Sequence, residues 1–165
     1  MSPDALAAGT TTRGLEVVQE WVTAIHVAKG RRLPMRAVEE VTAEAGRGLV
    51  GDRYHGSKHR HVSVQAADAL AEAAEILGRP VPAELTRRNL TISGASVPTE
   101  PGTRLRIGPV LLEVVRVAAP CKLLDDTLGA GAQGALRRRA GTIFRVLESG
   151  VITLETPVTL EESLF

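Results

Sequence analysis

This sequence of 165 residues contains a single cysteine, which is a candidate nucleophile or metal ligand. Cys121 follows Pro120 at the end of the apolar run VLLEVVRVAAP (110–120), and the residues after it predict a helix. A thiol beside a helix N-terminus and basic residues favours the thiolate, which binds soft metals or attacks electrophilic sulfur and carbon. Free cysteine is also among the residue types most often buried. A reactive thiol and an inert core cysteine therefore both remain open.

Two adjacent arginines and an asparagine form a second group with chemical potential. Arg87, Arg88 and Asn89 stand just before an apolar segment at 90–93 that predicts a strand. Guanidinium forks suit phosphate or carboxylate, and a side-chain amide offers a donor and an acceptor together, as the edge of a heterocycle requires. The group favours an anionic ligand.

A glycine-rich loop carries a third group. GRGLVGDRYHG (46–56) has four glycines in eleven residues, too many for a regular element. Within it, Asp52 and Arg53 form either a structural ion pair or a pair that orients a ligand. His55 stands close to His59 and His61, and the last two would share one face of a strand, so a two-histidine metal site is geometrically possible. The spacing matches no strong zinc signature, which favours a solvated, hydrogen-bonded histidine cluster.

Charge is distributed unevenly along the chain. The formal net charge is +1, but residues 116–145 hold six basic and two acidic side chains. This local excess indicates either an anion site or a solvated helix end. If residues 137–139 are helical, at most one or two of their three arginines face a common site, and Arg139 is the candidate. The small net charge and 2% aromatic residues argue against nucleic acid as a partner.

The elements that position these groups are mostly short strands. We expect strands at 16–28, 36–45, 61–64, 90–93, 104–107, 110–118, 143–147, 151–154 and 158–160. The clearest helix is 66–77, followed by helical turns within 82–88 and a mostly helical stretch over 121–139 that GAGAQG (129–134) interrupts. Ser149–Gly150 is predicted to be a hairpin turn. The pattern predicts a mainly β fold with few helices, a closed or nearly closed β-barrel, rather than a Rossmann fold.

The sequence also sets expectations about domains and compartment. Residues 1–14 read as a flexible tail and residues 15–165 as a single domain. One cysteine excludes an intramolecular disulfide or a multi-cysteine zinc cluster. No apolar run reaches the roughly 20 residues that span a bilayer, and the first residues show no secretory signal. We therefore expect a cytoplasmic protein with a reduced thiol and no membrane partner.

Five segments in order carry a family resemblance. They are GLVGDRYHG (48–56), TRRNLTISG (86–94), PGTRLRIG (101–108), PC (120–121) and GTIFRVLESGVI (141–152). From about Val22 to Val158 the chain resembles the MOSC domain family, named from the C-terminal part of molybdenum cofactor sulfurases, as a small stand-alone member. The resemblance implies a β-barrel-rich fold with a cleft for the molybdenum cofactor, molybdopterin.

The resemblance also implies roles for individual residues. Cys121 would ligate molybdenum or carry sulfur, and so be both the catalytic and the metal-binding residue. The resemblance likewise implies anion and pterin contacts from Arg87, Arg88 and Asn89. To these we add Asp52, Arg53, His55 and Arg139 as predicted cofactor-binding residues.

Two functions follow from these roles. The first is reduction of N-hydroxylated compounds with electrons from an external reductase, because one cysteine cannot hold an iron–sulfur cluster. The alternative is a non-catalytic carrier of cofactor or persulfide. The chain is too short for the pyridoxal-phosphate domain of the sulfurases, so no pyridoxal phosphate is expected. The oligomeric state stays open.

Overall fold

The computed structural model describes residues 19–161, so the predicted tail at 1–14 lies outside the described residues. The strands are β1 (Glu20–Val27), β2 (Arg36–Val38), β3 (Glu40–Glu44), β4 (Gly48–Leu49), β5 (Val62–Ala66), β6 (Leu90–Ile92), β7 (Arg104–Ile107), β8 (Val110–Val117), β9 (Thr142–Glu148), β10 (Gly150–Thr153) and β11 (Pro157–Glu161). The helices are α2 (Ala67–Leu77), the short 3₁₀ helix η2 (Ala83–Leu85), α3 (Leu123–Leu128) and α4 (Ala132–Ala135). No helix in the described part of the chain is long and apolar enough to cross a membrane.

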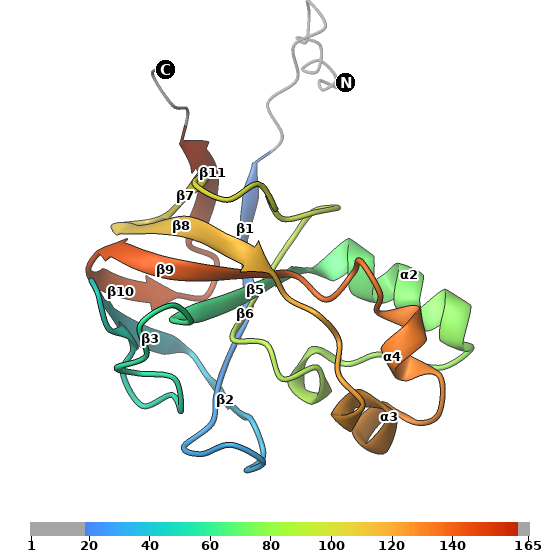
Figure 1. Cartoon of the computed structure of the whole chain (residues 1–165). Helices are drawn as coiled ribbons and strands as arrows, with labels where there is room; N and C mark the ends of the chain where they lie inside the picture. Colours follow the sequence, from blue (N-terminus) through green and yellow to red (C-terminus); the bar gives the residue numbers. More distant parts are fainter. Residues whose placement is uncertain (1–18, 162–165) are drawn as a thin grey trace, which may run out of the picture.

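Seven strands close into a barrel (Figure 1). Their order is β11-β7-β8-β9-β5-β6-β1, and β11 pairs with β1 to complete the ring. Strand β2 pairs with β1 alongside the barrel. Most neighbours are antiparallel, but β5 and β6 are parallel and α2 lies on the connection between them. The expectation of a mainly β, closed barrel is confirmed.

A second sheet of three strands, β10-β3-β4, corrects two details of the sequence-based prediction. The predicted strand at 36–45 is divided at Glu39, because β2 pairs with β1 while β3 pairs with β10. The predicted hairpin at Ser149–Gly150 is wrong, because β9 pairs with β5 and β8, and β10 pairs with β3. The chain leaves the barrel at this point and enters the other sheet.

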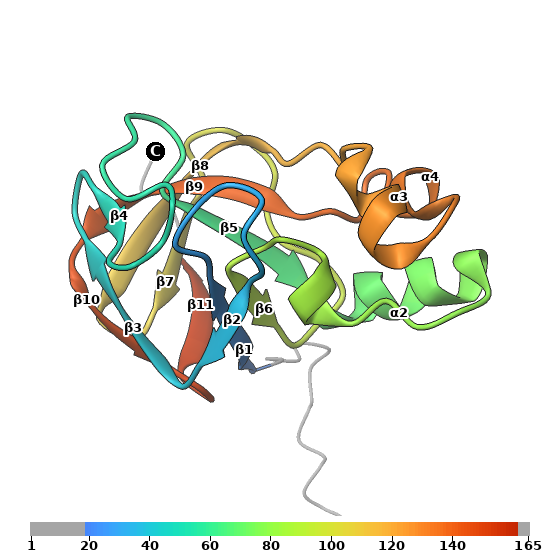
Figure 2. The ribbon, with the colours of Figure 1, turned by 90° about the horizontal axis from the view of Figure 1, so that it is seen from below.

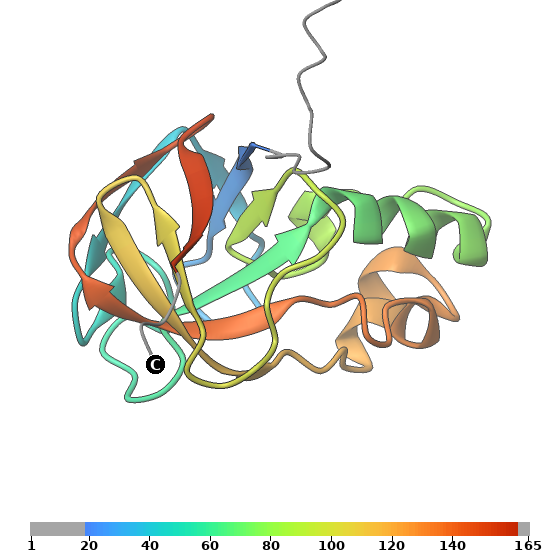
Figure 3. The same ribbon diagram turned by 90° about the horizontal axis from the view of Figure 1, so that it is seen from above.

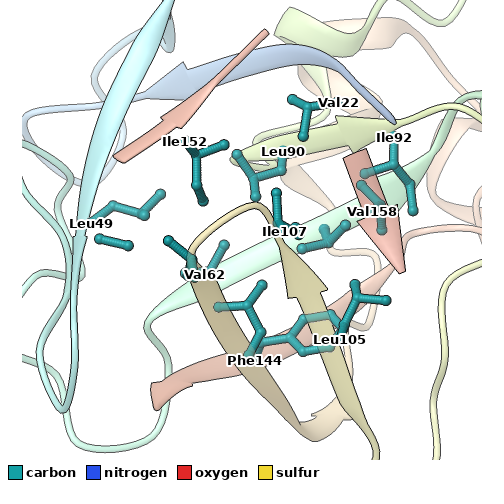
Figure 4. Close-up of a cluster of buried hydrophobic side chains, with 14 of the residues drawn as sticks. Val22, Leu49, Val62, Leu90, Ile92, Leu105, Ile107, Phe144, Ile152 and Val158 are labelled. Carbon is teal, nitrogen blue, oxygen red and sulfur yellow. The ribbon is translucent and has the colours of Figure 1, made fainter. Parts of the chain in front are cut away.

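The barrel interior is filled almost entirely by aliphatic side chains. Figure 4 shows side chains from many strands meeting in one cluster, among them Val22, Leu90, Ile107 and Ile152, with the ring of Phe144 beside Leu105. Alternation of buried and exposed residues places the side chains from the barrel strands on the inner face of the closed sheet, and Ile152 joins them from β10 of the second sheet. Few aromatic residues are needed because β-branched side chains pack densely on a pleated surface.

The helices gather at one side of the barrel, opposite the second sheet (Figures 1 and 2). They pack around a separate apolar cluster that includes Leu70, Leu124 and Leu136. Helix α2 ends at Gly78 in a left-handed conformation, as its Gly-Arg-Pro stop signal predicts. The stretch 121–139 forms two short helices, and α4 begins inside the segment 129–134 that we expected to interrupt the helix.

Candidate functional site

The carboxylate of Asp52 joins three segments of the chain. It is fully buried, and its Oδ1 accepts hydrogen bonds from the Ala28 backbone N–H at 3.1 Å, from Arg53 Nη1 at 3.0 Å and from Asn89 Nδ2 at 3.2 Å. Its Oδ2 accepts one from the Tyr54 N–H at 3.2 Å. A buried carboxylate needs this many donors to offset its lost hydration. Asp52 thus holds the glycine-rich loop against the end of β1 and the 86–89 segment.

The side-chain amide of Asn89 joins Asp52 to strands β1 and β5 by hydrogen bonds. Its Nδ2 donates to Asp52 and to the His26 carbonyl at 3.1 Å, and its Oδ1 accepts from the Ser63 backbone N–H at 3.0 Å and the Ser63 hydroxyl at 3.2 Å. The amide has two donors and two acceptor positions, and all four are used within the protein. Asn89 therefore positions the loops that surround it.

Arg53 links the glycine-rich loop to Arg87, another predicted site residue. Its side chain is 5% exposed, and its Nη2 donates to the Arg87 carbonyl at 3.1 Å. Arg87 itself has φ of +68°, a left-handed conformation that is uncommon for a residue other than glycine, and its Nη1 donates to the Leu33 carbonyl. Such conformations persist where surrounding contacts fix them, and they cluster at functional sites. The glycine-rich loop and the TRRN segment thus lie together.

Tyr54 lies between two guanidinium groups. The Cζ atom of Arg53 is 4.6 Å from the centre of the ring, and that of Arg60 is 4.3 Å from it. Attraction between a cation and the face of an aromatic ring stabilises both contacts. The Nε of Arg60 is buried and has no hydrogen-bond partner among residues 19–161. Sequence analysis did not select Arg60 or Tyr54. The signal that could have found them is the position of the only tyrosine in a segment that also carries arginines able to stack on its ring.

Arg88 supports the segment that carries Cys121. It is buried, and it donates from Nε to the Ala140 carbonyl at 2.7 Å and from Nη2 to the Ala119 carbonyl at 3.3 Å. Burial lowers the pKa of Arg88 to about 10, and the nearby charge of Arg60 contributes in the same direction. Arg88 still carries its positive charge at neutral pH. It fixes the backbone two residues before Cys121 and brings a cation close to it.

Cys121 is exposed and follows β8, which ends at Val117. It lies close enough to Arg87 and Arg88 for its charge to raise the pKa of both guanidinium groups, against the larger effect of burial. The predicted helix after Cys121 is present as α3, which begins at Leu123 and has six residues. Arg87 and Arg88 bring positive charges close to Cys121.

These residues form a strongly positive group, which we call the Cys121 cluster: Asp52, Arg53, Tyr54, Arg60, Arg87, Arg88, Arg116 and Cys121. Burial and the charges of Arg53 and Arg116 lower the pKa of Arg60, with Tyr54 and Asp52 opposing. Asp52 is the acidic member, and its charge is engaged by Arg53. Several guanidinium groups without matching carboxylates favour an anionic ligand.

Two predicted site residues lie elsewhere. His55 Nε2 is 2.7 Å from Glu44 Oε1, so its ring faces the second sheet. Arg139 donates from Nε to Glu72 on α2 at 3.1 Å. The basic side chains of residues 116–145 therefore do not all gather at one site, since Arg145 likewise pairs with an acidic residue, Glu113.

The histidines do not assemble a metal site. The His61 ring accepts a hydrogen bond from the Val146 N–H at Nδ1 and lies 2.8 Å from the Ser57 carbonyl at Nε2, while His59 is exposed. Within residues 19–161 no group of three or more histidine, cysteine, aspartate or glutamate side chains is arranged to hold a metal ion.

Comparison with known proteins identifies the family. A sequence profile described as the MOSC domain matches residues 51–159, which is most of the chain. The chain belongs to the MOSC domain family. The matched part of this MOSC protein includes Arg60, Arg87, Arg88 and Cys121, and MOSC domains are associated with binding of the molybdenum cofactor. No curated protein matches the chain significantly.

Solved structures share the fold of this MOSC protein. The YuaD protein from Bacillus subtilis superimposes with a TM-score of 0.77 at 14% identity, covering 86% of this chain and 94% of YuaD. YiiM from Geobacillus stearothermophilus gives 0.71 at 21% identity, covering 87% of this chain and 75% of YiiM. YiiM from Escherichia coli gives 0.68 at 18% identity, with 90% and 72% covered. At these identities the likeness establishes the fold.

Proposed function

We propose that this MOSC protein binds the molybdenum cofactor at the Cys121 cluster and reduces N-hydroxylated compounds there. The observation that carries the proposal is the exposed Cys121 beside Arg87 and Arg88, in a cluster whose Arg60 Nε is buried with no hydrogen-bond partner in residues 19–161. An anionic cofactor with a phosphate tail would give that Nε an acceptor and would reduce repulsion among the guanidinium groups. The residues present fit such a group.

Each part of the cluster would have its own task. The Cys121 thiolate would ligate molybdenum, a soft anionic ligand for a metal that is otherwise held by sulfur. Arg60 and the free nitrogens of Arg87 and Arg88 would bind the anionic groups. Asp52 and Asn89 keep the three segments in register, and their side chains are already saturated within the protein. When bound, the cofactor would supply two-electron redox chemistry.

The reaction balances with an external electron donor. In an N-hydroxylated substrate the N–O bond breaks, two electrons and two protons enter, and an amine and water leave. A lone cysteine holds no iron–sulfur cluster, so the electrons come from a separate reductase. Exposure of Cys121 leaves the site accessible to substrate and to that partner.

The same exposure supports a second candidate function, delivery of cofactor or of a persulfide on Cys121 to another protein. A carrier must present its cargo at the surface, and Cys121 does so. This carrier would use the same cluster but would need no reductase.

One preparation separates the two functions. The chain is expressed in a molybdate-replete host, and molybdenum, pterin fluorescence and the mass of the intact protein are measured. Turnover of an N-hydroxy compound is then followed with a reduced viologen dye as electron donor. Molybdenum with turnover supports the reductase. Cofactor without turnover, or one added sulfur atom on Cys121, supports the carrier. Protein that contains no molybdenum, pterin or added sulfur contradicts both.

A matched pair of variants tests the cluster directly. Arg60→Gln should lower pterin content several-fold, because it removes a cation whose Nε has no hydrogen-bond partner among the residues that the structure describes. Lys58→Gln removes the same charge from an exposed side chain in the same loop and should leave pterin content unchanged. Equal pterin content in both variants would contradict the assignment of Arg60.

A further inference from the structure

A cavity of about 340 Å³ lies at the end of the barrel where β5 continues into α2. Residues of four segments line it: Ala66 and Ala69; Ala95, Ser96, Val97 and Thr99; Val117; and Arg138, Arg139, Gly141 and Thr142. None of these residues belongs to the Cys121 cluster. Figure 3 shows β5 leading directly into α2, and the β6–β7 loop that contributes residues 95–99 crossing this end of the barrel. The volume lies within the range of small-molecule sites.

The cavity wall is partly apolar. Three alanines and two valines line it together with Ser96, Thr99, Thr142 and two arginines, and Val117 is 48% exposed although it is a large apolar side chain. Such small side chains leave room for a flat or branched hydrocarbon group. Burial of that group would remove the exposed surface of Val117 from water.

One of the two charged residues that line the cavity is not balanced by a partner among the described residues. Arg139 donates to Glu72 at 3.1 Å, so these two charges offset each other. Arg138 is exposed, and its side chain has no ion pair or hydrogen bond to any of residues 19–161. Its φ of +65° is a left-handed conformation, uncommon for arginine. An unpaired guanidinium beside a partly apolar cavity matches a carboxylate attached to a hydrocarbon group.

From this complementarity we propose that the cavity binds a small aromatic or branched aliphatic monocarboxylate. One negative charge on the ligand balances the positive charge of Arg138. The hydrocarbon part contacts Ala66, Ala69 and Val97, and the carboxylate accepts hydrogen bonds from the Arg138 guanidinium. The proposal does not depend on the molybdenum cofactor.

The test uses the full chain labelled with ¹⁵N and benzoate as the probe, titrated to about 10 mM, with amide chemical shifts as the readout. We expect saturable shifts at Ala69, Val97 and Gly141. Benzyl alcohol, which lacks the charge, should bind at least tenfold more weakly. Arg138→Gln should raise the Kd at least tenfold, and the same spectra report whether the variant is folded.

The matched control is Arg137→Gln, an exposed neighbour that does not line the cavity and should leave the Kd unchanged. Absence of saturable shifts would overturn the proposal, as would equal Kd values for the wild type and Arg138→Gln. Shifts that map to Arg88 and Cys121 instead would also overturn it, and would show that the Cys121 cluster attracts carboxylates.

Discussion

The Asn89 side-chain amide donates a hydrogen bond to the Asp52 carboxylate across a sequence separation of 37 residues, at 3.2 Å. Both residues are buried, and each makes further bonds to a different strand or loop. The pair therefore fixes where the glycine-rich loop meets the segment that carries Arg87 and Arg88. Its integrity sets the geometry of the whole Cys121 cluster.

Asp52→Asn should lower the free energy of unfolding by about 3 kcal/mol, because breaking a buried ion pair leaves Arg53 without its counter-charge. The asparagine would also direct a donor toward other donors. Urea unfolding monitored by circular dichroism measures the change. Asp126→Asn alters an exposed aspartate and should stay within about 0.5 kcal/mol of the wild type. Equal effects of the two substitutions would show that Asp52 is not an anchor.

Cys121→Ser should leave the melting temperature nearly unchanged, since the side chain is exposed and packs in no core cluster. Molybdenum content should fall to background, because an alcohol is a poor anionic ligand at neutral pH. Pterin should be retained, since the arginines are intact. Thermal melts combined with metal and pterin analysis test this pattern. A variant that keeps full molybdenum content would remove Cys121 from the metal site.

Stability should decrease as the pH falls below about 6.5. Burial lowers the pKa of His26 and of His61 in the folded protein, and His61 Nδ1 must stay unprotonated to accept the Val146 N–H. The unfolded chain therefore binds more protons in this range, and folding stability is complete above it. Urea unfolding from pH 5 to 7.5 should show a shallower pH slope in His61→Gln, by up to about one proton. Equal pH slopes for the wild type and His61→Gln would contradict this assignment.

Gly141→Ala should destabilise the fold by roughly 3 kcal/mol or more. Gly141 has φ of +92°, and a Cβ there would overlap the Val64 carbonyl oxygen of β5. The comparison is Gly134→Ala in α4, where a Cβ meets nothing within 4 Å and alanine should stabilise by about 0.5–1 kcal/mol. Chemical denaturation of both variants tests the contrast. Opposite signs are expected, and a shared sign would contradict the close approach of Gly141 to β5.

Element types were predictable because local patterns decide them. The apolar run at 110–118 became β8, and the periodic segment at 66–77 became α2. The division of 36–45 was not predictable, since it depends on β1 and β10 as pairing partners far away in sequence. The Ser149–Gly150 prediction failed for the same reason. A Ser-Gly pair marks a change of direction but does not say which sheet the chain enters.

The sequence by itself determined the strand-rich architecture, the absence of an intramolecular disulfide and the residues with chemical potential, because composition and periodicity are local properties. Only the tertiary structure decided which of those residues meet. It placed Arg87, Arg88 and Cys121 in one cluster, added Arg60 and Tyr54 to it, and directed His55 and Arg139 toward Glu44 and Glu72. The reason is physical: a side chain's partner follows from barrel closure and strand register, which depend on pairings between residues as far apart as Glu20 and Val158.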